Sequence, residues 1–123
     1  MQRRGGGDSF LRDCTVAGNE VGVRLRDEGK LFVRSTRFER NEVHVRALSP
    51  RTTLVMRGSS LLGRPPVELH PGRAFDLREN WWGAPTPNLA RRVRYSENAK
   101  SGDALLEPSL DEEPHAGAHG ADD

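Results

Sequence analysis

The sequence predicts an all-β protein: a right-handed parallel β-helix of about four 22-residue coils, with a C-terminal cap and a disordered tail. One observation is a repeat, because Asn19-Glu20-Val21-Gly22-Val23-Arg24 returns about 22 residues later as Asn41-Glu42-Val43-His44-Val45-Arg46. A second is the alternation of apolar and other residues in these runs, the period of two that sends successive side chains to opposite faces of a strand. A third is that no long segment carries a helical pattern.

The same offset arranges apolar residues along most of the chain into columns. The columns are Leu11, Val33, Val55 and Leu77; Val16, Phe38, Ser60 and Trp82; and Val23, Val45 and Val67. Turn-rich pairs such as Gly18-Asn19 and Pro71-Gly72 separate the runs. A single coil of two or three strands cannot bury its apolar face, so the columns predict coils stacked about 4.8 Å apart around a shared core.

Two other architectures share part of this pattern. Leucine-rich repeats have a similar period, but their asparagine follows the strand, whereas Asn19 and Asn41 precede it. Leucine-rich repeats also need a helix or helical turn in each repeat. A small antiparallel sandwich gives similar strand spacing but has no reason to keep columns in register. The sequence leaves both architectures as alternatives.

The chain of 123 residues is expected to divide into three parts. Residues 1–8 form a disordered N-terminus, residues 9–110 form the repeat domain with its cap at 80–110, and residues 111–123 form a disordered acidic tail. The first residues lack the apolar run of a secretory signal and lead directly into the repeat. We therefore expect an open first coil that docks on upstream coils or on another chain. No apolar run is long enough to cross a membrane, so no membrane partner is expected.

Charge is distributed unevenly. Up to residue 95 the chain holds 18 Lys and Arg against 10 Asp and Glu, and the remainder holds one Lys against 8 acids, in agreement with the total of +1. A basic body favours anionic polymers. The cations are almost all arginine, a bias that a GC-rich genome also produces, and nucleic acid is not the expected partner.

A column of like charges gives the candidate binding residues. Arg12, Arg34 and Arg78 align, with Met56 between them. Stacked like charges destabilise a sheet unless something neutralises them, and a carboxylate of an acidic polysaccharide does so with bidentate geometry. The acidic tail of the chain is the alternative partner. Trp81 joins the candidate site as a ring that could stack on a sugar, the alternative being burial under residues 84–95.

The stretch Asn80-Trp81-Trp82-Gly83 is the expected structural cap. Trp82 shares the inward column of Val16 and Phe38, and an aromatic ring buries enough area to close a narrow stack. Asn80 tolerates the left-handed conformation of a tight turn, and its amide can satisfy backbone groups. Gly83 completes the cap.

This stretch, with the Pro-rich residues 84–87 and the closing Leu105-Leu106-Glu107-Pro108-Ser109-Leu110, resembles the end of bacterial right-handed parallel β-helix repeat proteins of the pectin-lyase-like superfamily. The resemblance covers about residues 10–110. It implies the fold and an extracellular or periplasmic location. The family includes polysaccharide lyases and hydrolases, and a periplasmic copper-binding accessory protein.

No catalytic site is predicted, because the lyases use acidic clusters for Ca²⁺ and the hydrolases use paired Asp residues. The candidate carboxylates form no such pair: Asp13, Asp27, Asp76 and Glu79. Arg57 shares a column with Asp13, and the alignment fits a salt-bridge partner of Asp13 as well as a catalytic residue. His44 is expected on the surface. His115 and His119 could hold a metal only loosely, so no metal site and no cofactor are predicted.

The sequence therefore predicts a non-catalytic β-helix module, structural or carbohydrate-associated, that forms the C-terminal part of a longer protein. The alternatives are a fragment of a polysaccharide lyase or glycoside hydrolase, and a periplasmic copper-binding accessory protein.

Overall fold

The computed structural model describes residues 8–26, 28–84, 88–97, 99 and 102–114. The predicted disorder at residues 1–7 and 115–123, together with His115 and His119, lies outside the described residues. The described part forms ten short strands and one helix of a single turn. The elements are β1 (Asp8–Arg12), β2 (Thr15–Ala17), β3 (Val21–Leu25), β4 (Lys30–Arg34), β5 (Arg37–Glu39), β6 (Val43–Ala47), β7 (Thr53–Arg57), β8 (Ser60–Leu61), β9 (Val67–Leu69), α1 (Leu89–Arg92) and β10 (Val93–Tyr95).

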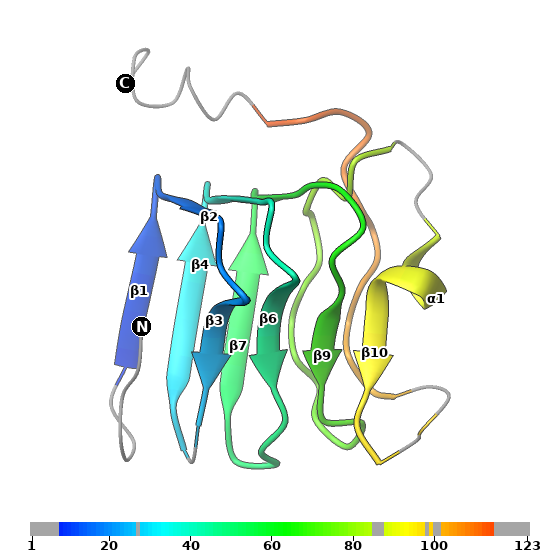
Figure 1. Ribbon diagram of the computed structural model, residues 1–123. Helices are drawn as coiled ribbons and strands as arrows, with labels where there is room; N and C mark the ends of the chain where they lie inside the picture. Colours follow the sequence, from blue (N-terminus) through cyan, green and yellow to red (C-terminus); the bar gives the residue numbers. More distant parts are fainter. Residues whose placement is uncertain (1–7, 27, 85–87, 98, 100–101, 115–123) are drawn as a thin grey trace.

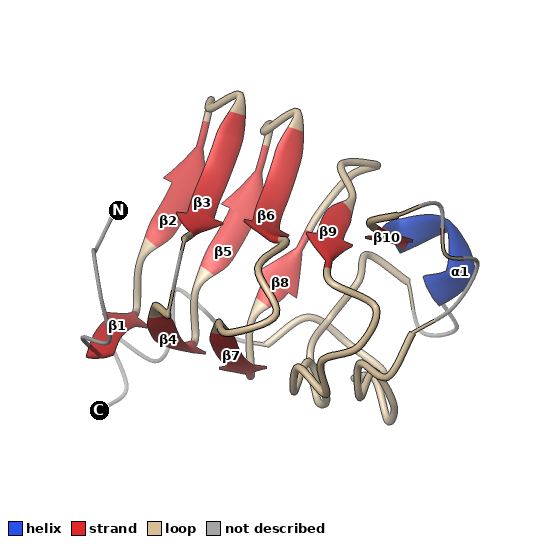
Figure 2. Cartoon of the chain, turned by 90° about the horizontal axis from the view of Figure 1, so that it is seen from below, coloured by secondary structure: helices blue, strands red, loops and turns tan. Residues whose placement is uncertain are grey.

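The strands build three sheets that form the sides of a parallel β-helix (Figure 1). Figure 2 shows the three sheets from another side, with the orders β1-β4-β7, β2-β5-β8 and β3-β6-β9-β10. All pairs of neighbouring strands are parallel, and each neighbour comes from the preceding or following coil. This confirms the predicted stack of about four coils at roughly 22-residue spacing. The parallel pairing excludes an antiparallel sandwich, and three strands in a coil exclude a leucine-rich repeat.

The third coil is one residue out of step with the repeat. Phe10 pairs with Phe32 as expected, but Phe32 pairs with Val55, one position further than the repeat predicts. The cause is the turn between β6 and β7, where residues 48–52 replace the shorter turn 26–29 between β3 and β4. The original register returns at β9, where Val45 pairs with Val67.

This extra residue corrects three predicted columns. Met56 takes the inward place next to Val33 that was predicted for Val55, and Leu61 takes the place next to Phe38 that was predicted for Ser60. Arg57 takes the outward place next to Arg34 that was predicted for Met56. The inward columns that contain Val33 and Phe38 are therefore apolar throughout. The fully buried core includes Leu31, Val33, Phe38, Val45, Ala47, Leu54, Met56, Leu61, Val67, Leu69 and Leu77.

A polar ladder runs along the corner between the first two sheets. The backbone N–H of Thr36 donates to Ser59 Oγ, and the N–H of Ser59 donates to Asn80 Oδ1, both at 3.1 Å. Asn80 Nδ2 donates to the carbonyls of Met56 and Leu77, each at 2.8 Å. The prediction that Asn80 satisfies backbone groups is confirmed. The predicted left-handed conformation belongs instead to the preceding Glu79, whose φ is 64°.

Beyond the fourth coil the chain covers one end of the core. Trp82 is 2% exposed, and Gly83 has a φ of 92°, a conformation that favours glycine. Leu89 of α1 and Leu106 pack on the buried cluster. β10 extends the sheet β3-β6-β9.

The opposite end of the core is uncovered by described residues. The inward side chains Leu11, Val16 and Leu25 of the first coil are only partly buried, whereas Phe38 and Ala47 in the second coil are fully buried. Their strands β1, β2 and β3 are each the last strand of a sheet. β1 begins at Asp8, one residue before the predicted start of the repeat domain.

Candidate functional site

The outward side of sheet β1-β4-β7 combines two stacked aromatic rings with two arginines. Phe10 and Phe32 are partners in the register, with ring centroids 5.3 Å apart and ring planes inclined by 20°. Phe10 is 67% exposed, which is unusual for a large apolar side chain. Two positions further along each strand, Arg12 pairs with Arg34, and both are exposed. We call these four residues the aromatic–arginine face.

The two arginines of this face are not neutralised by the described part of the chain. Neighbouring strands lie about 4.8 Å apart, so the guanidinium groups of Arg12 and Arg34 repel each other. Neither side chain makes a hydrogen bond or an ion pair with another described residue. Within the described part of the chain, the face therefore presents two unpaired positive charges beside a ring stack whose outer member, Phe10, is exposed.

The two arginines further along the same column are neutralised. Asp76 accepts hydrogen bonds from Arg78, through Nε at 3.0 Å and Nη2 at 3.0 Å, and from Arg57 Nη2 at 2.6 Å. The hydrogen bonds of Arg78 and then those of Arg57 hold the pKa of the Asp76 carboxyl well below its usual range. Arg78 is thus less available than predicted. Arg57, which the sequence paired with Asp13, pairs with Asp76 and, at 3.6 Å, with Glu79.

Trp81 does not belong to this face. It bridges to Ser60 of β8, so it continues sheet β2-β5-β8 across a corner from the arginine column. Its side chain is half-buried. Trp81, a separate candidate from the sequence, therefore lies on a different sheet from the arginine column.

The described start of the acidic tail contacts a different arginine. Leu110 donates its backbone N–H to the carbonyl of Asn80 in the fourth coil. Glu113 then accepts a hydrogen bond from Arg37 Nη1 of β5 at 3.0 Å. Residues 110–113 thus run back along sheet β2-β5-β8, and in Figure 1 this orange segment crosses toward the first coils. Within residues 111–114, the tail pairs with Arg37 and not with the arginine column.

His44 is buried, and its predicted surface position is wrong. Its exposed fraction is 0%. Asn41 Nδ2 lies 3.1 Å from Nδ1, and Nε2 lies 2.8 Å from the carbonyl oxygen of Leu62. Burial lowers the pKa of His44 to about 4, aided by the positive charge of Arg92 and opposed by the bond to Leu62. The neutral imidazole bridges the second and third coils and has no access to a ligand.

No cluster of potential metal ligands is present within the described ranges. No group of three His, Cys, Asp or Glu side chains there could hold a metal ion. Asp76 has a strongly perturbed pKa, but its carboxylate is fully engaged by two guanidinium groups. None of the described helical residues forms a segment long and apolar enough to span a membrane.

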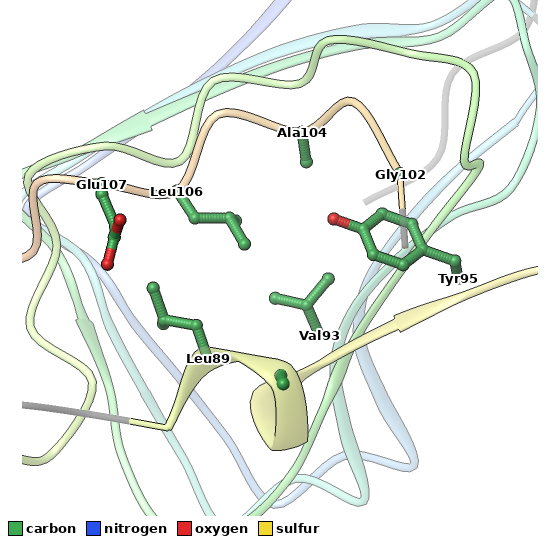
Figure 3. A pocket seen from close by; sticks show the side chains of 8 residues that line it. Leu89, Val93, Tyr95, Gly102, Ala104, Leu106 and Glu107 are labelled. Atoms are coloured by element: carbon green, nitrogen blue, oxygen red, sulfur yellow. The ribbon is translucent and has the colours of Figure 1, made fainter. Parts of the chain in front are cut away.

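A pocket of about 390 Å³ lies at the covered end of the core (Figure 3). Leu89, Val93 and Leu106 project into it from α1, β10 and the closing segment. Its polar groups are the Tyr95 hydroxyl and the Glu107 carboxylate. Burial raises the pKa of Tyr95, with a contribution from Asp103, so the phenol stays neutral. The lining is mostly aliphatic and gives no charge pattern that would select a ligand.

Sequence reasoning identified two of the four face residues and missed the other two. Phe10 and Phe32 could have been found from the alternation itself. Because Leu11 and Val33 point inward, the residues on either side of them point outward, and these are Phe and Arg in both coils.

Comparisons of this chain with protein-family models, with curated proteins and with solved structures gave no match.

Proposed function

We propose that this chain is a non-catalytic, carbohydrate-associated β-helix module that binds an acidic polysaccharide on its aromatic–arginine face. One observation carries the proposal. The first two coils carry a stacked pair, the exposed Phe10 and the partly exposed Phe32, next to two arginines that have no carboxylate partner among the described residues. Further along the same column, the carboxylate of Asp76 neutralises Arg57 and Arg78.

The chemistry of the four side chains matches such a ligand. Aromatic rings offer apolar faces that can pack on the C–H surface of a sugar. Arginine binds carboxylates through two parallel N–H···O bonds. A polymer that alternates apolar ring faces with carboxylates would place the former over Phe10 and Phe32 and the latter over Arg12 and Arg34. The ligand charge would also remove the repulsion between the two guanidinium groups.

The binding role is favoured over catalysis by the state of Asp76. Asp76 belongs to the same sheet side as the face, but a carboxylate with a depressed pKa that is bound by two arginines is a poor acid or base at neutral pH. The resemblance to extracellular and periplasmic β-helix proteins remains a further support for a carbohydrate partner. The calcium-dependent lyase and copper-binding alternatives have no supporting metal-ligand cluster among the described residues.

Affinity electrophoresis in native gels tests the proposal. Gels are cast with pectate, alginate, heparin or neutral xylan, at low and at moderate salt. We expect retardation by one acidic glycan that survives moderate salt, that is lost in Arg34→Gln, and that is weakened in Phe10→Ala. Arg94→Gln is the matched control, because Arg94 is an exposed arginine of β10 in another sheet.

Equal mobility in every gel would contradict glycan binding. Equal loss of retardation in Arg34→Gln and Arg94→Gln would show that the glycan is attracted by the net charge of the protein and not by the face. Moderate salt screens such attraction.

A structural role is supported by a separate observation, the uncovered first coil. Among the described residues, no segment fully covers Leu11, Val16 and Leu25, and they leave apolar surface beside three edge strands. An added coil, from upstream sequence or from another chain, would pair with β1, β2 and β3 and bury that surface. Sedimentation of the chain at increasing concentration tests pairing between copies. We expect reversible association that Leu11→Lys abolishes, and a monomer at all concentrations would exclude self-docking.

A further inference from the structure

A second hollow, of about 630 Å³, lies near α1, away from the aromatic–arginine face. Arg64 comes from the segment between β8 and β9, and Arg91 and Arg92 come from α1. Trp82 and Asn88 also line the hollow. Figure 2 shows α1 beside β10, at the end of the stack opposite β1. None of the described residues that line it is acidic. We call it the arginine hollow.

Arg92 is the inner cation of the arginine hollow. Its Nη1 donates to the carbonyl oxygen of Trp82 at 2.6 Å, and its Nη2 donates to that of Leu61 at 2.8 Å. Its guanidinium carbon lies 5.4 Å from the centre of the Trp82 ring. Burial lowers the pKa of Arg92 from its ordinary value. The charge is held by carbonyls and an aromatic face, and no carboxylate within the described ranges pairs with it.

Two buried donors at the arginine hollow have no acceptor. Trp82 is 2% exposed, and its indole Nε1–H has no hydrogen-bond partner. Arg92 Nε is likewise buried without a partner. An unpaired buried donor costs about 1–3 kcal/mol, and most such groups in proteins find a partner. The two outer arginines, Arg64 and Arg91, are exposed and make no ion pair with described residues.

We propose that the arginine hollow binds a tetrahedral oxyanion, the phosphate or sulfate group of a small ester. Such a group offers several acceptor oxygens, enough for the guanidinium groups of Arg64 and Arg91. The unpartnered donors of Trp82 and Arg92 are closed to solvent, so the anion would reach them through a small shift of the side chains that line the hollow. Arginine forks match this geometry in a bidentate manner. The hollow has the volume of a small-molecule site and exceeds what the anion alone would fill, so the remaining space takes the rest of the ester. This site does not depend on the glycan proposal.

Binding is measured by calorimetry and by the indole N–H resonances of the full chain. The probes are inorganic phosphate, inorganic sulfate, glucose 6-phosphate and glucose, titrated at constant ionic strength. We expect saturable binding of at least one oxyanion probe and none of glucose. The Trp82 indole N–H should move downfield as it gains an acceptor, while that of Trp81 stays in place. Trp81→Phe assigns the two resonances.

The variants Arg64→Gln and Arg91→Gln should each weaken binding about tenfold or more, the value of one charge-assisted hydrogen bond. Both residues are exposed, so these variants should fold. Arg26→Gln carries the same charge change at an exposed position in the turn between β3 and β4, and should leave the affinity unchanged. Tighter binding of glucose 6-phosphate than of inorganic phosphate would identify a phosphate ester as the ligand, and preference for sulfate would identify a sulfate ester.

Three results would overturn the proposal. The first is the absence of saturable binding with all oxyanion probes. The second is a loss in Arg26→Gln equal to that in Arg91→Gln, which would show attraction to net charge only. The third is binding that leaves the Trp82 resonance unmoved, which would place the anion elsewhere. None of these outcomes bears on polysaccharide retardation, so the two proposals fail or stand separately.

Discussion

Asn41 donates its side-chain amide to Nδ1 of His44 at 3.1 Å, and this bond fixes the histidine as the Nε2–H tautomer. Nε2–H then donates to the Leu62 carbonyl at 2.8 Å. The oxygen of the same Asn41 amide accepts from Asn19 Nδ2 at 3.1 Å. A hydrogen-bonded chain thus runs through three coils. Asn19 and Asn41 supply its first two members, and the imidazole of His44 makes the contact with the third coil.

This arrangement predicts a stability that falls as pH drops below neutral. His44 has a pKa of about 4 in the folded chain and about 6.5 when unfolded. Between these values the unfolded state binds the proton and the folded state does not, so stability is complete above pH 6.5 and is lost as pH falls toward 4. The expected loss is roughly 3 kcal/mol.

Urea unfolding at pH 7.0 and pH 4.5 measures this loss. His44→Gln retains a polar side chain that does not titrate, so the variant should show a much smaller difference between the two pH values. The depressed pKa of Asp76 acts below this window, because its stabilisation is lost only as pH falls below the ordinary carboxyl range. Identical pH dependence in the parent chain and in His44→Gln would contradict the assignment.

Asn80→Ala should be one of the most destabilising polar substitutions. It would leave the carbonyls of Met56 and Leu77 and the N–H of Ser59 unsatisfied inside the protein. The expected cost is about 3 kcal/mol or more. Asn19→Ala is the matched control, because Asn19 is exposed in the first coil and should change stability far less. Equal unfolding midpoints for the two variants would show that the hydrogen bonds of Asn80 do not contribute this much to the free energy of unfolding.

Trp82→Ala tests whether the second tryptophan of the pair closes the core. Trp82 is 2% exposed, whereas its neighbour Trp81 is half-buried on the outer side of sheet β2-β5-β8. Removing a buried tryptophan costs about 3–5 kcal/mol, enough to unfold a marginal domain. Thermal unfolding by circular dichroism compares the two single alanine variants. An equal fall of the unfolding midpoint in Trp81→Ala and Trp82→Ala would contradict the assignment of Trp82 as the residue that closes the core.

The sequence predicted most of the fold because the 22-residue repeat in the sequence reflects the stacking of coils in the structure. Strands that stack in register place equivalent residues above one another, so columns of valine and leucine report the pairing directly. The prediction became wrong where one residue was inserted in the turn 48–52. A shift by one position exchanges the inward and outward faces of a strand. For that reason Met56 was assigned to the arginine column and Arg57 was missed.

The candidate site was harder to predict, because exposure and pairing depend on contacts between coils. The sequence pointed to Arg12 and Arg34, but nothing in the spacing shows that Asp76 engages Arg57 and Arg78. His44 was assigned to the surface because it replaces Gly22 in a strand that otherwise alternates. At Gly22 an added Cβ would lie 2.6 Å from the carbonyl oxygen of His44, so the two positions are not equivalent environments.

Asp76→Asn should extend the aromatic–arginine face while weakening the fold. The substitution removes the negative charge that Arg57 and Arg78 share, so Arg78 loses its carboxylate partner and Arg57 keeps only the longer contact with Glu79 at 3.6 Å. We expect stability to fall by about 1–3 kcal/mol and retardation in the gel with the bound acidic glycan to increase.

Glu68→Gln is a close control, since Glu68 and Asp76 have equally sheltered side chains, both 16% exposed, and each pairs with two arginines. Glu68 belongs to sheet β3-β6-β9-β10, away from the face. Stronger retardation in Asp76→Asn alone would place the polymer along the arginine column. An equal increase in both variants would reflect net charge, and unchanged retardation in Asp76→Asn would confine the polymer to the first two coils.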